Sequence, residues 1–200
     1  MQLSISTATA ACSVALIQRE TLVAERHEVV GRGHAERLVP LIRDLVGSRQ
    51  PDSILVDCGP GSFTGIRVGL AAARALALAW SIPVNGYSTL SLIAAGATSD
   101  APTLGVAILG GHGELFVQDF TAHPLTQATG IASMPIDSAA SFIASELVFG
   151  SGAEELVRAR GYGSGLDALP RAANARLLPP TLRELKPSAI YVRAPDASVA

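Results

Sequence analysis

The sequence predicts an α/β fold, on three observations. Short β-prone runs alternate with segments whose apolar residues recur at helical spacing. A near-continuous apolar run over residues 52–58 is typical of a strand covered on both faces of a sheet. A glycine-rich loop follows that run and leads into an alanine-rich helix that extends to residue 80. The composition agrees with a folded domain, because 48% of the residues are hydrophobic and only 16% are charged, which is enough apolar surface for a packed core.

The chain begins with three β-prone runs, at residues 2–6, 12–18 and 21–30. Small or polar residues separate them, which predicts a meander at the edge of a sheet. An apolar stripe at helical spacing then predicts a helix over residues 33–47, ended by Gly47. The stripe consists of Leu38, Leu41, Ile42 and Leu45.

After the alanine-rich helix, a strand is predicted at 82–88 and a helix at 89–97. Residues 98–103 are small and polar and contain a proline, so they form the best candidate linker. They divide the chain into an N-terminal lobe, 1–100, and a smaller C-terminal lobe, 101–200.

The second half restarts on β structure. Two β-prone runs around the turn at 110–113 predict a hairpin. A helix, a strand and a second helix follow at 136–144, 146–152 and 153–161. Residues 161–180 are the least regular, 187–193 are β-like, and the tail after Pro195 is expected to fray.

Charge and composition exclude several function classes. A net charge of −2 provides no overall field that would recruit RNA or an anionic membrane. The 15 Lys and Arg are scattered and aromatics make up 4%, so nucleic-acid binding by this chain alone is not supported. No window has the roughly 18 consecutive apolar residues of a membrane span, and the N-terminus lacks a secretory signal. Cys12 and Cys58 fit two reduced, buried thiols in a cytoplasmic protein.

The glycine-rich loop departs from known phosphate loops. Five residues separate Gly59 from Gly65, where a Walker-A loop has four and then Lys-Ser/Thr. Backbone N–H groups at the start of a helix could still face an anion. The alternative is a tight strand-to-helix turn capped by Ser62 or Thr64. The candidate phosphate loop comprises Gly59, Gly61, Ser62, Thr64 and Gly65.

The helix after the loop has mostly small side chains, so another backbone could approach it closely. Arg67 and Arg74 are seven residues apart and therefore share a face, from which they could reach a partner's carboxylates or phosphates. The alternative is a thin helix on its own sheet with two solvated arginines.

The run GPGSFTGIRVGLAAARALA, followed by IPVNGYSTL, resembles the bacterial TsaB (YeaZ) family. ACSVAL, GHAERLVPLI, GELF and IYVRAP extend the resemblance over nearly the whole chain. It implies a two-lobed actin-like ATPase (ASKHA, ribonuclease H-like) fold with mixed sheets and helices. It also implies a role in forming threonylcarbamoyladenosine at position 37 of tRNAs that decode ANN codons.

Members of that family are non-catalytic partners of the transferase TsaD. The same pathway includes the ATPase TsaE and TsaC, which makes threonylcarbamoyl-adenylate. The resemblance implies a heterodimer through the two N-terminal helices. The expected contact residues are Leu38, Leu41, Ile42, Leu45, Arg67, Leu70, Ala73, Arg74 and Ala77. Any tRNA contact would be made only by the assembled complex.

Several residues depart from the family's pattern in a way that favours a non-catalytic role. Ser6 stands where actin-like ATPases place the Asp that holds Mg²⁺–phosphate, and Leu38 stands where a second metal-binding His would follow His34. His34 is expected at a solvent edge or as a cap. Leu109 and Gly111 stand where relatives usually have Asp and Arg.

The sequence contains few other groups of residues that could form a catalytic or metal-binding site. Asp57, directly before the loop, is expected to be a solvated carboxylate at a strand end. No catalytic residue, metal site or peptidase constellation can be assembled from the motifs. We expect no cofactor on this chain alone; any ATP and Mg²⁺ would bind at the assembled complex. The alternatives are an actin-superfamily ATPase or phosphotransferase with its own nucleotide site, and a homodimer through the same helices.

Overall fold

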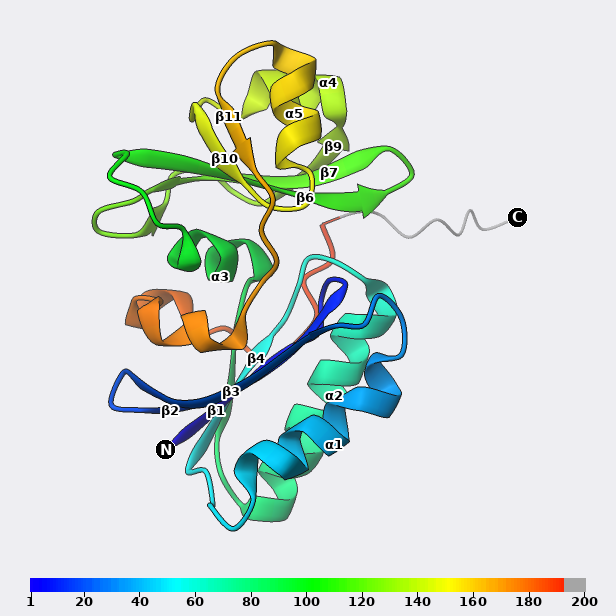
Figure 1. Ribbon diagram of the computed structural model, residues 1–200, viewed down its shortest axis with the longest axis vertical. Coiled ribbons are helices and arrows are strands. Elements are labelled where there is room, and N and C mark those ends of the chain that lie inside the picture. Colours follow the sequence, from blue (N-terminus) through cyan, green and yellow to red (C-terminus); the bar gives the residue numbers. More distant parts are fainter. Residues whose placement is uncertain (193–200) are drawn as a thin grey trace.

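The computed structural model describes residues 1–192, in which two sheets occupy two lobes (Figure 1). The first sheet has the order β3-β2-β1-β4-β5. Its strands are β1 (Gln2–Ser6), β2 (Ala11–Gln18), β3 (Thr21–Val29), β4 (Ser53–Asp57) and β5 (Val84–Tyr87). The first three strands are antiparallel neighbours, which confirms the predicted meander, and β4 and β5 run parallel to β1.

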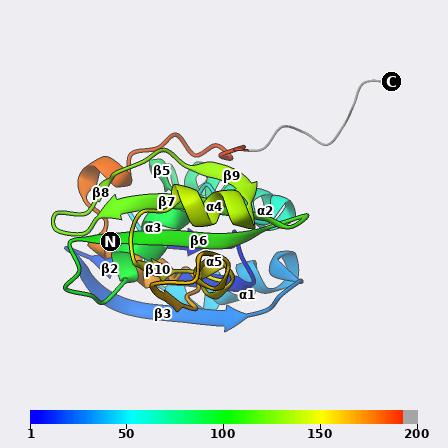
Figure 2. The same ribbon diagram turned by 90° about the horizontal axis from the view of Figure 1, so that it is seen from above.

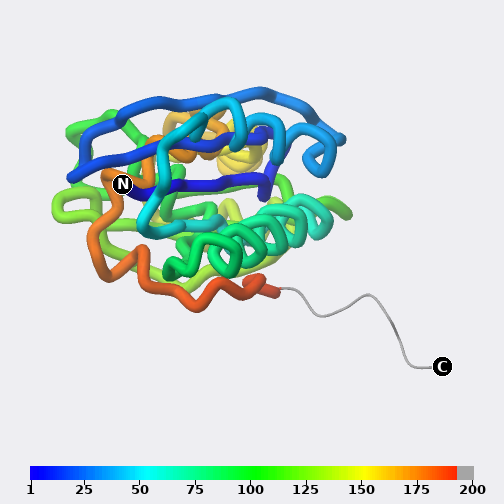
Figure 3. The backbone as a smooth tube through the Cα atoms, turned by 90° about the horizontal axis from the view of Figure 1, so that it is seen from below, coloured from blue at the N-terminus to red at the C-terminus, as the bar shows by residue number. Residues whose placement is uncertain are grey.

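Two long helices, α1 (His34–Val46) and α2 (Phe63–Trp80), lie together on one face of the first sheet (Figures 1 and 3). Both predicted helices are thereby confirmed. The apolar stripe of α1 packs into the core of this lobe, as expected of an amphipathic helix on a sheet. Gly47 ends α1 with a positive φ.

The opposite face of the first sheet is covered by α3 (Thr89–Gly96) and by two 3₁₀ turns, η1 (Ala172–Leu177) and η2 (Pro180–Leu182). Ser88 caps α3 by accepting a hydrogen bond from Ser91 N at 3.0 Å. Because α3 packs against both η1 and the second sheet, it lies between the two lobes (Figure 1).

The second sheet has the order β11-β10-β6-β7-β8, with β9 also paired to β7. Its strands are β6 (Thr103–Gly111), β7 (Glu114–Thr121), β8 (Thr126–Gln127), β9 (Ala132–Pro135), β10 (Leu147–Phe149) and β11 (Ser164–Leu166). The β6–β7 pair confirms the predicted hairpin. Helices α4 (Ile136–Phe142) and α5 (Ala153–Arg160) cover the face of this sheet that is turned away from the first lobe (Figures 1 and 2).

After β11 the chain returns to the first lobe. Ala172 N donates to Ser13 Oγ at 2.9 Å, Leu185 forms a β-bridge with Gly86, and Ile190 N donates to Cys58 O at 2.8 Å. We call residues 168–192 the returning segment. The sequence placed it in the C-terminal lobe and predicted a strand at 187–193, but its residues up to 192 form none. The predicted frayed tail lies outside the described residues.

The arrangement of an antiparallel three-strand meander followed by two parallel strands is that of a ribonuclease H-like lobe. The expected two-lobed actin-like fold is therefore confirmed, while the division into domains at residue 100 stays a prediction. Among the described helices, α2 has the length and mean hydropathy, 1.2, of a membrane span. That is weak support for a span, because α2 packs one face into the core of its own lobe.

Candidate functional site

The glycine loop, residues 58–65, connects β4 to α2 and packs against the turn between β1 and β2. A Cβ on Gly61, whose φ is +154°, would come within 2.0 Å of Ala8 O. A Cβ on Gly65 would come within 2.1 Å of Thr7 O. Both glycines are therefore required by the close approach of two backbone segments.

Several backbone N–H groups of this loop are already engaged by the chain itself. Gly59 N donates to Asp57 Oδ1 at 2.9 Å, and Ser62 N donates to Ala8 O at 2.7 Å. Gly65 N donates to Ser62 Oγ at 3.2 Å, which makes Ser62 the cap of α2, while Thr64 is exposed. The tight-turn interpretation accounts for this geometry, and binding of phosphate by the loop stays a prediction.

Asp57 is buried, with 1% of its surface exposed, so the expectation of a solvated carboxylate is wrong. It accepts hydrogen bonds from Ser6 Oγ at 2.7 Å, Thr89 Oγ1 at 2.6 Å and Gly59 N at 2.9 Å. Burial raises the pKa of Asp57 to about 6, and these three hydrogen bonds offset part of the rise. The sequence could not reveal this, because Ser6 and Thr89 reach Asp57 from distant parts of the chain.

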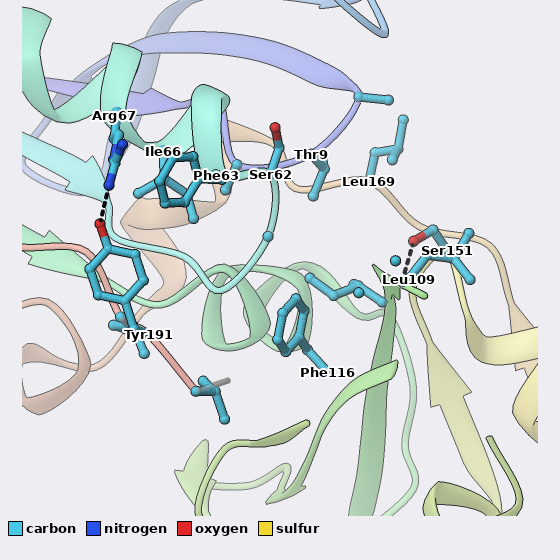
Figure 4. A pocket seen from close by; sticks show the side chains of 18 of the residues that line it. Thr9, Ser62, Phe63, Ile66, Arg67, Leu109, Phe116, Ser151, Leu169 and Tyr191 are labelled. Carbon is cyan, nitrogen blue, oxygen red and sulfur yellow. Dashed lines mark hydrogen bonds between the residues drawn. The ribbon is translucent and has the colours of Figure 1, made fainter. Parts of the chain in front are cut away.

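A cleft of about 1090 Å³ lies between the lobes (Figure 4). The glycine loop and the β1–β2 turn form one wall, the β6–β7 hairpin forms another, and the returning segment contributes Ile190 and Tyr191. Arg67 lies over the ring of Phe63, with Cζ 3.4 Å from the ring centroid, and its Nη2 is 3.4 Å from Tyr191 Oη. The walls are otherwise largely apolar, with Ile66, Ile108, Leu109, Phe116 and Leu169 among them.

The cleft does not fit an Mg²⁺–nucleotide. Mg²⁺ is usually held by carboxylates, and the described residues that line the cleft include no Asp or Glu. Ser6 does not replace the missing acid, because its hydroxyl is bonded to Asp57. The departures Leu109 and Gly111 both line the cleft, together with His112. Residues 1–192 also contain no cluster of three or more His, Cys, Asp or Glu that could hold a metal ion.

The structure separates the expected interface residues into two groups. Seven are buried in the core beneath α1 and α2, so these side chains do not lie on the surface that a partner would meet. The seven are Leu38, Leu41, Ile42, Leu45, Leu70, Ala73 and Ala77. The physical reason is that the apolar stripe of an amphipathic helix is buried by packing against the sheet of its own chain. Instead, Val39 and Leu78 carry exposed apolar surface on these helices, at 62% and 83% exposure.

Arg67 and Arg74 are exposed, as expected of residues that share a face of α2. Both are engaged by the returning segment, because Arg67 bonds Tyr191 Oη and the Nη2 of Arg74 donates to Pro187 O. No sequence pattern predicted this role of the returning segment. The residues concerned are more than 100 positions apart, and no local pattern joins them.

Two further expectations concern single residues. His34 is buried at the start of α1, with Nε2 3.3 Å from Ala11 O, so its expected place at a solvent edge is wrong. The β2 backbone supplies the hydrogen-bond partner that makes this burial acceptable. Cys12 and Cys58 are both buried and free, as expected.

Comparison with known proteins identifies the family. Residues 23–158 match the family model described as TsaD, tRNA N6-adenosine threonylcarbamoyltransferase. The chain is 42% identical over 100 residues to the tRNA threonylcarbamoyladenosine biosynthesis protein TsaB of Escherichia coli, an alignment that covers 48% of this chain and 43% of that protein. It is 38% identical over 97 residues to TsaB of Haemophilus influenzae, covering 46% and 41%. The matched part of the chain thus spans less than half of either relative.

Two solved structures resemble nearly all of the chain. YeaZ from Pseudomonas aeruginosa has 29% identity and a TM-score of 0.76, covering 88% of this chain and 89% of that one. A second structure, described as an uncharacterized protein with similarity to peptidase YEAZ from Pseudomonas aeruginosa, has 27% identity and a TM-score of 0.81, covering 96% and 99%. The family-model match extends over more than half of the chain, and the TsaB and YeaZ relatives agree with it. The chain belongs to the TsaB (YeaZ) family.

Proposed function

We propose that this chain takes part in forming threonylcarbamoyladenosine at position 37 of ANN-decoding tRNAs, as a non-catalytic, cytoplasmic subunit that binds a TsaD-type transferase. Its TsaB relatives are named for threonylcarbamoyladenosine biosynthesis, and the matched family model is described as a threonylcarbamoyltransferase. These names support the pathway, and the geometry of this chain supports the division of labour within it.

The observation that carries the non-catalytic role is the state of the glycine loop and the cleft beside it. Three N–H groups of the loop, those of Gly59, Ser62 and Gly65, donate to Asp57, Ala8 O and Ser62 Oγ, so these three are not available to a ligand. The one acid next to the loop, Asp57, is buried beneath it and does not line the cleft. Among the described residues, the cleft lacks the carboxylate that phosphoryl-transfer enzymes use to hold Mg²⁺.

The partner surface in this proposal is the outward side of α1 and α2. Small residues on α2, Ala71 and Ala75, are exposed and allow another helix to approach closely. Val39 and Leu78 add large, exposed apolar side chains of the kind that the core of an interface buries. The surface combines close-approach positions with larger apolar side chains, which is what a helix-on-helix interface requires.

The proposal is tested by co-expressing the tagged chain with the TsaD-type protein of the same organism and measuring capture. Leu78→Asp is expected to abolish capture, because a charge would be buried at the interface, and to leave the circular dichroism spectrum unchanged. Leu166→Asp is the matched control, because Leu166 is an exposed leucine on the second sheet. Equal capture by both variants would contradict the proposed surface, and no capture by the unaltered chain would contradict the partnership.

The alternative of an ATPase or phosphotransferase predicts a different result for the isolated chain. If the purified protein hydrolyses Mg-ATP, and Leu78→Asp hydrolyses it equally well, the ATPase alternative would be favoured over the proposed function. In cells that lack the chain, the proposed function predicts loss of threonylcarbamoyladenosine from bulk tRNA, measured by mass spectrometry of nucleosides.

A further inference from the structure

A second cavity, distinct from the cleft, lies on the other side of the molecule. We call it the arginine pocket. It has a volume of about 550 Å³ and is bordered by the end of α3, the turn after β7 and the returning segment. The cleft takes its second-lobe wall from the turn before β7, so the two cavities lie at opposite ends of that strand. Its charged and ionisable lining residues are Glu20, His123, Arg176 and Arg183.

Arg176 is the unusual member of this set. It stands in the last turn of η1, its Nε is buried, and this atom has no hydrogen-bond partner within residues 1–192. Nor does the described part of the chain form an ion pair with its guanidinium. A guanidinium is always charged, and a buried N–H donor without a partner costs free energy, although the Arg176 residue as a whole is only half-buried. The unpaired donor is therefore available to an anion.

Arg183 provides a second cation at the same pocket. It follows η2, its side chain is 20% exposed, and its Nη2 lies 3.3 Å from Glu20 Oε1. Glu20 is the only carboxylate among the described lining residues, and its side chain is 72% exposed on the β2–β3 turn. It neutralises at most one of the two arginines. The C-terminal end of α3 adds a partial negative charge, smaller than one whole guanidinium charge.

From this geometry we infer that the arginine pocket binds a small phosphate monoester, with the phosphate held by Arg176 and Arg183. A phosphate monoester carries nearly two negative charges at neutral pH, which matches two guanidinium groups better than a single carboxylate does. Each planar guanidinium can donate two parallel hydrogen bonds to phosphate oxygens.

The volume of the pocket and its other lining residues restrict which chemical group can be attached to the phosphate. A volume of about 550 Å³ exceeds the needs of a bare phosphate and lies within the usual range for small-molecule sites. Apolar walls come from Ala94, Leu104, Leu125 and Leu178. Apart from His123, no aromatic side chain lines the pocket in the described part of the chain, so there is no platform for stacking a base. A sugar phosphate or a short alkyl phosphate fits these walls better than a nucleotide does.

Isothermal titration of the full chain with ribose 5-phosphate, inorganic phosphate and a short single-stranded RNA tests the inference. Ribose 5-phosphate is expected to bind most tightly. Arg176→Gln is expected to weaken its binding roughly tenfold or more, because charge-assisted hydrogen bonds are lost. Arg158→Gln is the matched control, since Arg158 is exposed on α5 and outside both cavities. Its binding should equal that of the unaltered chain.

Thermal melting separates a binding role from a structural one. In phosphate-free buffer, Arg176→Gln is expected to melt at the same temperature as the unaltered chain or higher, because a buried N–H donor without a partner has been removed. Ribose 5-phosphate should raise the melting temperature of the unaltered chain and of Arg158→Gln, but not that of Arg176→Gln. Absence of binding at millimolar ligand, binding unaffected by Arg176→Gln, or binding of RNA alone would each overturn the inference.

Discussion

The buried carboxyl of Asp57 makes the stability of this protein depend on pH in an unusual direction. Its pKa is raised from 3.8 to about 6, so between these values the folded chain holds a proton that the unfolded chain releases. Stability therefore falls as pH rises from about 4 to about 6 and is constant above. The difference of about two pKa units corresponds to about 3 kcal/mol in the free energy of unfolding.

Asp57→Asn isolates this contribution, because an amide keeps the size of the side chain and does not titrate. Urea unfolding of both proteins between about pH 4 and about pH 7 gives the stability difference at each pH. We expect the unaltered chain to lose about 2 kcal/mol relative to the variant over this range, because at about pH 4 the unfolded carboxyl is already more than half ionised and part of the full difference has been lost. Any hydrogen bond lost in the variant changes the stability difference between the two proteins by the same amount at every pH. Carboxylates whose pKa is lowered, such as Glu28 and Asp52, act in the opposite sense in both proteins and cancel.

A difference that stays constant with pH would show that the pKa of Asp57 is the same in both states. A stability difference that grows in favour of the unaltered chain as pH rises would show that the folded state lowers the pKa of Asp57. The hydrogen bonds from Ser6, Thr89 and Gly59 would then affect this pKa more than burial does. Either result would refute the argument that desolvation dominates at this position.

Two further predictions follow from the packing of the glycine loop and of the thiols. Gly61→Ala is expected to lower the free energy of unfolding by about 2 kcal/mol or more, because its Cβ would overlap Ala8 O. Gly130→Ala, where nothing lies within 4 Å, is the control, and equal losses in urea unfolding would contradict the packing argument. Burial raises the pKa of Cys12 and of Cys58 to about 11, so a thiol reagent at mildly alkaline pH should modify them far more slowly in the folded protein than in urea. Equally fast modification in both conditions would show that the thiols are accessible.

Local signals predicted most of the elements in this chain. The helix at His34–Val46 and the β6–β7 hairpin followed directly from apolar spacing and turn residues. Ser62 was one of two predicted caps and is the one used. Short-range patterns succeed here because a helix cap, an amphipathic stripe and a hairpin turn are each decided by residues that are near neighbours in the chain.

The same stripe misled the prediction of an interface. Leu41 and Ala73 were expected to face a partner, but they lie in the core, and the exposed side of the helices is represented by Val39 and Leu78. Periodicity identifies which residues share a face. It does not say whether that face meets the chain's own sheet or another protein, because both remove the same apolar surface from water.

The sequence by itself determined the order of strands and helices from β1 to β7, the motif that marks the family, and the loss of an acid at Ser6. Only the tertiary structure decided the environment of Asp57, the return of residues 168–192 to the first lobe, and the meeting of Arg176 with Arg183 in one pocket. These features depend on contacts between residues far apart in the chain. Burial, charge balance and pKa are properties of such contacts, so no local pattern encodes them.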